Sequence, residues 1–543
     1  MQDSTRTRMR PPRRRFWALA SALVAGLALV TSVHAQAEPQ RGGDLVFVHQ
    51  QRATSLDANV WTATNAARIM RQIYDPLVWQ PEGGVFVPGL ATRWEISDDG
   101  LEYTFWLRDD VVFHDGTPFN AEAVKATFDR MVDPATRSLQ VGRLGPYERS
   151  EVIDEFTVRV VLSEPFNVFM SNLSEVALAP ASPTATERLG DDYALNPVAT
   201  GPFRVQGWPD DNTVVLERNP DYAWGPEFWN NRGPAYLDTI TYRFVEESAT
   251  RLITIETGEA DIIDAPPAQE LDRLVASGRY QIDSFVVPGM PQILNVNITV
   301  SPTDELAVRR AVMHAVDRDA LASVLFFGVN PPAHGPLSSG SWAFWPEIAD
   351  MYPFDLELAG QLLDEAGWVM NAATGIRERD GVPLRIRHVT SSGGDNPRVS
   401  EFFQGSVLEV GIDWVVEAMQ YEATVVRYAA NDYEASRLAY ALIDPHDAFF
   451  LAYHSSQIEG GGQFNRTRIA DPELDDLIAR GEASTDAEER REIYRELQER
   501  IMDQVYMWPA YELVLVHVTQ EHVQDFAVDL LGRPYMNDVW MSR

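Results

Sequence analysis

The sequence contains no cysteine and only one lysine, Lys125, among its 543 residues. Without cysteine the chain can form no disulfide, thiolate zinc site, iron–sulfur cluster or cysteine nucleophile. Positive charge is also scarce, because 45 lysines and arginines stand against 80 acidic residues and leave a formal charge of −35. A protein this negative repels a phosphate backbone, so we expect no nucleic-acid partner.

Apolar residues, in contrast, are plentiful enough for large cores. They make up 45% of the sequence, which excludes a disordered chain. At roughly 100–200 residues per domain, the length predicts two or more packing units.

The first 37 residues have the three-part pattern of a cleavable export signal. Six arginines precede an apolar run from Phe16 to Val33, and Ala35 and Ala37 supply the small residues of a cleavage site. A membrane anchor is the alternative, but serine, glycine and threonine interrupt a run that is close to the minimum length for a span. The pair Arg13-Arg14 leaves both the general secretory and the twin-arginine route open. We therefore expect a periplasmic protein of net charge −40, because residues 1–37 carry six arginines and one aspartate.

Short strands and amphipathic helices are mixed along the rest of the chain. Asn120 and Asp471-Pro472 predict helix starts, and Thr485 with Glu488 predicts a capping box for a further helix. This mixture is typical of an α/β or α+β protein with two lobes. Alternating apolar and polar residues or short β-branched runs predict strands at 44–49, 101–108, 157–162, 213–217 and 239–244.

Sequence signatures of enzymes are missing or weak. The chain has no G-x-S-x-G, no H-E-x-x-H, no G-x-x-x-x-G-K-[ST] and no G-x-G-x-x-G after a strand. Asp444, His446, Asp447 and His454 are the nearest approach to a metal cluster, but their spacing matches no common ligand pattern. We expect no metal and no cofactor. Paired carboxylates suited to glycoside hydrolysis stay open, so an exported hydrolase is the competing class.

Several short motifs follow one another between residues 40 and 515. They include LATRWE at 90–95, FHDG at 113–116, TGPF at 200–203, RNPDY at 218–222, TGEAD at 257–261, VRRAV at 308–312, LLDEAGW at 362–368 and DPELD at 471–475. Each motif is weak alone. In this order the series resembles the extracytoplasmic solute-binding proteins of the dipeptide, oligopeptide and nickel class, which feed ABC importers.

The resemblance implies an α/β fold with two lobes and a hinge, the cluster C type of periplasmic binding protein with an extra subdomain in lobe I. It implies lobe I at 38–287 plus 518–543, and lobe II at 288–517. The ligand would bind in the cleft, and closure of the hinge would bury it. The closed form would then dock on the permease subunits in the membrane. Such a protein is not an enzyme, and its large like charge predicts a monomer.

A peptide is the first ligand that the resemblance implies. Dipeptide-type members pair the ligand ammonium with an acid shortly before an Asp-Pro element. Here that element is Asp444-Pro445, and three residues earlier stands Ala441. A buried ammonium without a partner would cost several kcal/mol. Either Asp444 or Asp447 therefore substitutes, or the ligand is a sugar, an opine-like solute or a chelated metal.

Five side chains are our candidates for contact with the ligand, and each has a structural alternative. Asn65 follows the segment that the resemblance places at the ligand, or it caps a helix. Trp342 lies on an irregular stretch rich in glycine and serine, where aromatic residues are often functional. Tyr440 stacks on the ligand or simply packs. Asp444 pairs with a cationic group or starts a turn, and His446 contacts the ligand or belongs to that turn.

Overall fold

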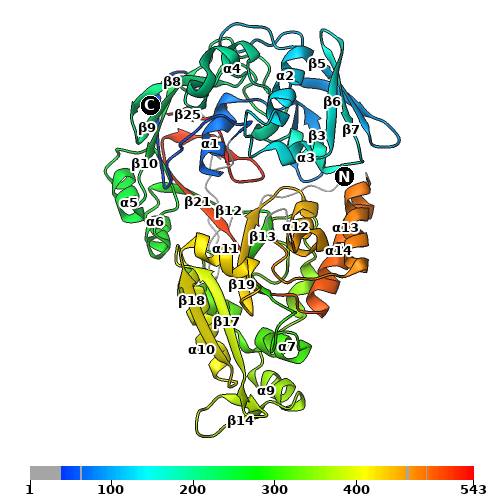
Figure 1. The fold of residues 1–543 in the computed structure, drawn as a ribbon. Helices are drawn as coiled ribbons and strands as arrows, with labels where there is room; N and C mark the ends of the chain where they lie inside the picture. The colour runs from blue at the N-terminus through cyan, green and yellow to red at the C-terminus, as the bar shows by residue number, and fades with distance from the viewer. Residues whose placement is uncertain (1–37, 61–63, 460–463, 485, 543) are drawn as a thin grey trace, which may run out of the picture. The chain divides into compact units, whose positions relative to one another are not determined.

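The computed structural model describes residues 38–60, 64–459, 464–484 and 486–542, so the predicted export signal lies outside the described residues. Among the residues that are described, no helix is long and apolar enough to cross a membrane. The chain is mixed α/β, as predicted, and builds its cores on three main sheets (Figure 1).

The largest sheet has seven strands in the order β12-β21-β11-β1-β10-β9-β8. β1 pairs in parallel with β10 and β11, and the other pairs are antiparallel. The strands are β1 (Asp44–His49), β8 (Phe203–Asp210), β9 (Thr213–Arg218), β10 (Thr239–Phe244), β11 (Ile262–Asp264), β12 (Tyr280–Val286) and β21 (Val514–Gln520).

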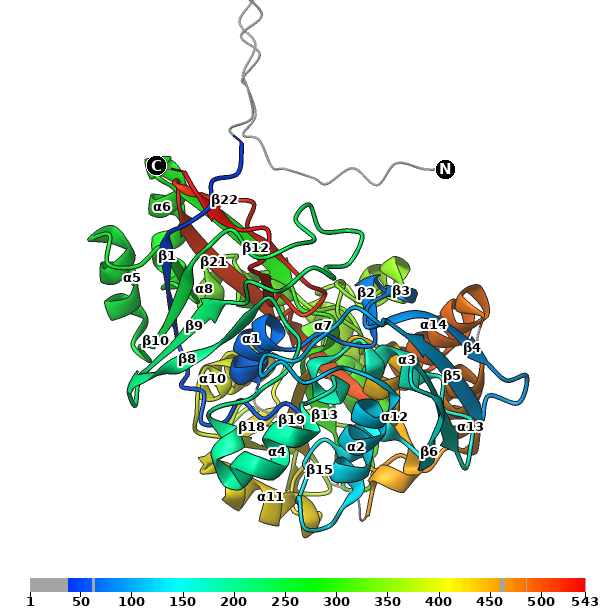
Figure 2. The same cartoon turned by 90° about the horizontal axis from the view of Figure 1, so that it is seen from above.

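Helices cover both faces of this sheet. Leu45 and Phe47 of β1 join the core under α1 (Thr64–Ile73), whereas Val48 joins the core with α5 (Ser248–Glu256) and α6 (Leu271–Ser277). This division follows from the two-residue period of a strand, which sends successive side chains to opposite faces. Seen from above, α1 lies on one side of β1 and β10, and α5 on the other (Figure 2).

A second sheet of four antiparallel strands has the order β4-β5-β7-β6, and its core is shared with α2 (Ala121–Val132). Beside it lie the hairpin β2–β3 and the helices α3 and α4. The bounds are β2 (Val78–Glu82), β3 (Val85–Pro88), β4 (Ala91–Ile96), β5 (Glu102–Leu107), β6 (Tyr147–Asp154), β7 (Thr157–Leu162), α3 (Val168–Leu173) and α4 (Pro183–Leu189).

The third sheet has five strands in the order β18-β17-β19-β13-β20 and a single large core. Its strands are β13 (Gly289–Val296), β17 (Arg385–Ser391), β18 (Asp413–Met419), β19 (Ala435–Ala441) and β20 (Met507–Tyr511). Its helices are α7 (Leu306–Ala315), α8 (Arg318–Phe326), α9 (Leu356–Glu365), α10 (Asn396–Leu408), α11 (Tyr421–Ala429), α12 (Pro445–Tyr453), α13 (Pro472–Ala483) and α14 (Ala487–Asp503).

Short strands complete the structure. They are β14 (Val369–Met370), β15 (Arg377–Arg379), β16 (Val382–Pro383), β22 (Val523–Gln524), β23 (Ala527–Val528), β24 (Pro534–Tyr535) and β25 (Trp540–Met541).

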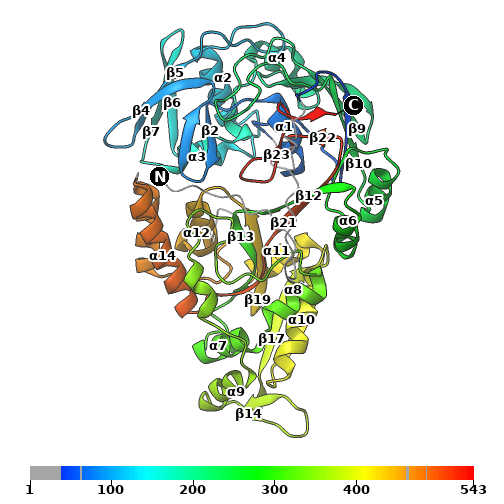
Figure 3. The same ribbon diagram turned by 180° about the vertical axis from the view of Figure 1, so that it is seen from behind.

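The chain passes between the seven-stranded and the five-stranded sheet at two short crossings. Val287 and Pro288 connect β12 to β13, and Glu512 and Leu513 connect β20 to β21 (Figure 3). The backbone N–H of Val287 donates to the carbonyl oxygen of Leu513 at 2.8 Å, so the two crossings lie side by side.

Most local predictions are confirmed. The five predicted strands are β1, β5, β7, β9 and β10. Asn120 caps α2 by accepting from the N–H of Ala123 at 3.1 Å, and Asp471 caps α13. The predicted capping box of α14 is wrong, because Asp486 caps this helix and accepts from the N–H groups of Glu488 and Glu489. Thr485 lies outside the described residues.

Candidate functional site

Asp444 lies where β19 ends and α12 begins. Its carboxylate caps α12 by accepting from the N–H of His446 at 2.9 Å, and Pro445 occupies the first turn, where a missing N–H costs nothing. Arg490 of α14 donates to the same carboxylate at 2.6 Å, and Ser171 of α3 donates to it at 3.2 Å. Both oxygens of Asp444 therefore have protein partners.

A small cavity lies beside Asp444, between α3 and the end of β19. It measures about 10 Å³, close to the space that one water molecule needs. Helix α3 and the end of β19 therefore lie against each other with almost no space between them. It is lined by Arg143, Ser171, Asn172, Glu175, Ala441, Leu442, Ile443, Asp444, Asp447 and Leu531.

Asp447 is the acid of this cavity without a hydrogen-bond partner in the described part of the chain. None of the described residues donates a hydrogen bond to its carboxylate, although its neighbour Asp444 has three donors. Burial, with repulsion from Asp444, raises the pKa of Asp447 to about 7. A cation entering the cavity would therefore favour the ionised form of Asp447.

The neighbouring buried charges neutralise one another. Arg533 donates to Glu175 at 2.6 and 2.9 Å and to Asp529 at 2.6 Å, and Arg71 lies 3.3 Å from Asp529. Burial alone would raise the pKa of Glu175, but the Arg533 guanidinium outweighs it and brings that pKa to about 2. Two arginines and two carboxylates form a closed set, so this network is structural.

Arg437 of β19 and Arg466 lie near each other, and within the described ranges neither has an acidic partner. Arg437 donates through Nε to the amide oxygen of Gln292 at 2.9 Å, and Arg466 donates to the carbonyl oxygen of Arg437 at 2.6 Å. The Arg466 guanidinium lies 4.3 Å from the ring centre of Tyr428. Arg466 is only 6% exposed, and its Nε has no hydrogen-bond partner among the residues that the structure describes. Burial lowers the pKa of Arg437, and the charge of Arg466 lowers it further.

Tyr440 and Trp342 are both partly buried. Tyr440 packs edge-on against Phe464 with ring centres 5.6 Å apart, and burial raises its pKa. Trp342 lies against Gly83 of the β2–β3 turn and packs on Tyr494, with ring centres 5.8 Å apart. Its indole N–H is buried without a partner in the described chain. Trp342 therefore joins the two sides of the molecule.

His446 lies in the first turn of α12 and is buried, stacked on Phe450 at 5.6 Å. Burial lowers its pKa to about 4, so its imidazole is neutral at pH 7. Asn65 is the second residue of α1, and its role at the ligand stays a prediction. Across the described ranges, no three His, Asp or Glu side chains converge as metal ligands would.

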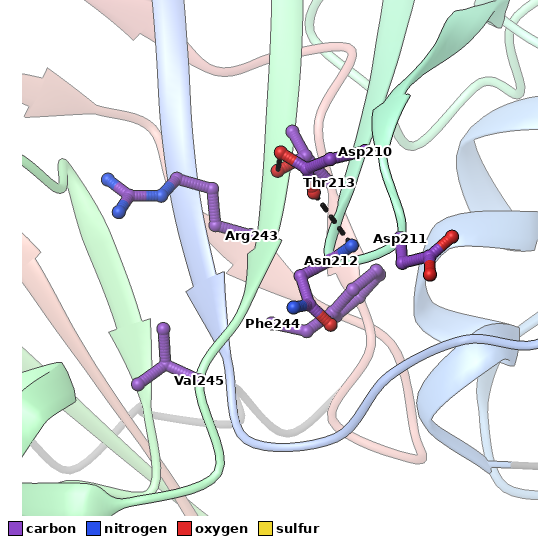
Figure 4. A pocket seen from close by; sticks show the side chains of 7 residues that line it. All are labelled: Asp210, Asp211, Asn212, Thr213, Arg243, Phe244 and Val245. Atoms are coloured by element: carbon purple, nitrogen blue, oxygen red, sulfur yellow. Dashed lines mark hydrogen bonds between the residues drawn. The ribbon is translucent and has the colours of Figure 1, made fainter.

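A larger hollow of about 680 Å³ lies at one end of the seven-stranded sheet (Figure 4). Its acids are used locally, because Asp210 accepts from the N–H of Asn212 at 2.7 Å and from the Thr213 hydroxyl at 3.2 Å. Arg243 points away from this turn. The hollow therefore offers no convergent set of free polar groups. It is lined by Asp210, Asp211, Asn212, Thr213, Arg243, Phe244 and Val245.

Three features define the class of protein: sheets joined by two short crossings, a small cavity between their elements, and charged side chains that line it. They are the features of a two-lobed binding protein. The chain belongs to the bacterial extracellular solute-binding proteins, family 5, because the model of that family's middle region matches residues 85–461. It is the extracytoplasmic solute-binding component of an ABC importer, as the sequence motifs predict.

Named relatives agree with this assignment. The glutathione-binding protein GsiB of Escherichia coli O1:K1 / APEC is 30% identical over 518 residues, which are 94% of each chain. GsiB of Pectobacterium atrosepticum is 29% identical over 84% of this chain and 86% of its own.

Solved structures show the same fold. NikA from Brucella suis, in complex with Fe(III)-EDTA, superimposes with a TM-score of 0.81 at 26% identity over 92% of this chain and all of that chain. DppA from Helicobacter pylori, in complex with the peptide STSA, gives a TM-score of 0.74 at 26% identity over 93% of this chain and 99% of that one. We call the part of the chain built on the five-stranded sheet lobe II, and the rest lobe I.

Proposed function

We propose that this protein captures a small acidic peptide in the periplasm and delivers it to the permease of an ABC importer. By an acidic peptide we mean one with more carboxylates than ammonium groups, as in glutathione, the ligand named for its relatives. The observation that carries the proposal is the pair Arg437 and Arg466, which has no acidic partner among the described residues.

Arg466 is buried and Arg437 is half-buried, and guanidinium groups removed from water without a carboxylate are costly unless another group supplies the charge. A ligand carboxylate would do so, because a guanidinium matches it with two parallel hydrogen bonds. The mature chain carries a net charge of about −40 by its sequence. The two unpaired arginines are therefore a local excess of positive charge in a strongly negative protein.

For the ligand ammonium we propose Asp447. Its carboxylate lines the cavity next to Ala441, whereas the oxygens of Asp444 already bind Arg490, Ser171 and the backbone. Asp444 and His446 would then support the ammonium site, and Tyr440 would lie between it and the arginines. Trp342 and Asn65 complete the proposed cleft.

We propose that lobe I comprises residues 38–287 and that lobe II begins at residue 288. Because β21 (Val514–Gln520) belongs to the seven-stranded sheet, we place the return to lobe I at the Glu512–Leu513 crossing, a few residues before the expected 518. Opening about the two crossings would admit the ligand, and closure would bury it. No bond is made or broken in this cycle, so we propose that the protein is not an enzyme. It would act as a monomer, exported by the signal in residues 1–37.

Calorimetry on residues 38–543 with glutathione as the probe tests the proposal. We expect stoichiometric binding, lost when both carboxylates of glutathione are amidated. Arg437→Gln should weaken binding by about 2–4 kcal/mol. Arg385→Gln, on the adjacent strand and 55% exposed, is the matched control and should bind normally.

An unchanged affinity of Arg437→Gln for glutathione would contradict the role of the arginines. A second candidate ligand is a chelated metal, favoured by the likeness to NikA with its polycarboxylate Fe(III)-EDTA. Binding of Fe(III)-EDTA but not of glutathione in the same titration would favour that candidate.

A further inference from the structure

A buried acid lies in one of the two crossings between the lobes. Glu512 follows β20 and is only 2% exposed. Its Oε1 accepts from the backbone N–H of Ser339 at 3.0 Å. Its Oε2 is buried and has no hydrogen-bond partner in the part of the chain that the structure describes.

The loop 338–341 is hydrogen-bonded to both crossings near Glu512. The Ser338 hydroxyl donates to the carbonyl oxygen of Val287 at 2.6 Å, and the Ser341 hydroxyl accepts from the N–H of Gly289 at 2.8 Å. Because the N–H of Val287 donates in turn to Leu513, the loop and the two crossings form one hydrogen-bonded unit around Glu512. A rotation of the lobes about the two crossings would have to change backbone angles within this unit.

Within the described ranges, no charged side chain compensates the Glu512 carboxylate. The segments that pack on it offer neutral groups. The Ser338 and Ser339 side chains oppose the effect of burial on the Glu512 pKa, Asn330 donates to its carbonyl oxygen at 2.8 Å, and its own N–H donates to Pro331 at 2.8 Å. The preceding Tyr511 packs on Phe326, with ring centres 4.2 Å apart. Among the described residues, no Arg, Lys, His, Asp or Glu side chain acts on Glu512, and burial raises its pKa.

We propose that Glu512 is a proton-linked latch of the hinge, protonated when the crossings pack on the 338–341 loop and ionised when the hinge opens. In the packed form the neutral acid avoids a buried charge with a bare oxygen. In the open form water solvates the carboxylate. Closure therefore takes up a proton, so the closed population rises as pH falls and declines as pH rises. This link is independent of which solute the cleft binds.

Small-angle scattering of ligand-free residues 38–543 between about pH 5 and pH 8 tests the latch. The radius of gyration of the wild type should rise with pH. Glu512→Gln keeps the acceptor for Ser339 but carries no titrating group, so this rise should be smaller or absent. Glu521→Gln, an exposed acid in the same C-terminal segment, should behave like the wild type.

Asp447 also titrates in this range, but it is present in every variant, so the difference between wild type and Glu512→Gln isolates the hinge. Circular dichroism would confirm folding, and Glu512→Met replaces the glutamine variant if the latter does not fold. A wild-type radius that does not change with pH, or the same pH course in the variant without the acid, would overturn the proposal.

Discussion

Arg490 donates a hydrogen bond of 2.6 Å to Asp444, and the same carboxylate accepts from Ser171 of lobe I. Both partners of this ion pair are buried, with side-chain exposures of 10% and 2%. The Asp444 carboxylate thus caps α12, neutralises the charge of Arg490 on α14 and accepts a hydrogen bond from α3. The family resemblance suggests a ligand ammonium as the partner of this acid, but its geometry is that of a structural ion pair.

Asp444→Asn should therefore lower the free energy of unfolding. The amide can still cap α12, but it leaves the buried Arg490 without a counter-charge, which costs about 3 kcal/mol. Urea unfolding of the variant and of Asp486→Asn, an exposed cap on α14, measures this difference. A loss no larger than that of the control would show that the pair contributes little.

The same variant also tests whether Asp444 or Asp447 binds the ligand ammonium, since the sequence analysis allows either. If Asp444 carries the ligand ammonium, Asp444→Asn weakens binding by roughly 2–5 kcal/mol. We expect the larger loss of affinity from Asp447→Asn instead, because no described residue donates a hydrogen bond to the Asp447 carboxylate. Calorimetry on both folded variants decides between them.

Asp447 should also make stability depend on pH. Its folded-state pKa of about 7 lies above the ordinary value of 3.8, so between these values the folded state binds more protons than the unfolded state. Stability then falls as pH rises from about 4 to about 7 and levels off above. Asp447→Asn removes this loss, so at pH 8 the variant should be more stable than wild type by roughly 1–2 kcal/mol, discounted for partial exposure.

At about pH 4 the wild type and Asp447→Asn should unfold at the same temperature, since both side chains are then neutral. Thermal unfolding followed at a series of pH values provides the measurement. A variant that is less stable than wild type at pH 8 would contradict the assigned pKa.

Gly83 should control closure of the cleft. A methyl group at this position would lie 2.5 Å from Cβ of Trp342, too close to the backbone of lobe II for a side-chain rotation to relieve. Overpacking of this kind costs about 1–3 kcal/mol. Gly83→Ala should therefore enlarge the radius of gyration with ligand present and weaken binding about tenfold or more.

Gly207→Ala is the control for this substitution, because no atom of the described residues lies within 4 Å of its added methyl group. It should leave both the radius and the affinity unchanged. If the Gly83→Ala variant has the same radius of gyration and the same affinity as the control, the contact between Gly83 and Trp342 does not control closure of the cleft.

The predictions that succeeded are those that depend on short stretches of chain. β7 spans Thr157–Leu162 as predicted because apolar, β-branched residues fix a strand locally, and Asn120 caps α2 because its side chain reaches only three residues ahead. The prediction for the N-terminus of α14 failed because several adjacent polar residues can each act as the N-cap, and the structure uses Asp486. The helix then starts where packing of its Ile493 and Leu497 into the lobe II core requires it.

Sequence reasoning brought attention to Ala441 and Asp447 but missed Arg437 and Arg466. Whether an arginine has an acidic partner depends on which strand lies next to it, and here β13 brings Gln292 to Arg437. That pairing joins residues 145 positions apart. One signal was available: Arg437 interrupts a run of small and apolar residues in β19.

The export signal gives a prediction that is independent of the folded domain. Replacing Arg13 and Arg14 by lysine should block export only if the twin-arginine route carries the protein. Cell fractionation of the variant and the wild type would measure the periplasmic yield. A normal yield would assign export to the general secretory route.

The cleft, as we propose it, holds a small acidic peptide between Asp447 and the arginine pair. Mass spectrometry of the solute released from residues 38–543, purified under native conditions, is the most direct test of this proposal. We expect a stoichiometric peptide with at least two free carboxylates, absent from protein that carries Arg437→Gln. Release of a neutral sugar, or of any solute without a carboxylate, would contradict it.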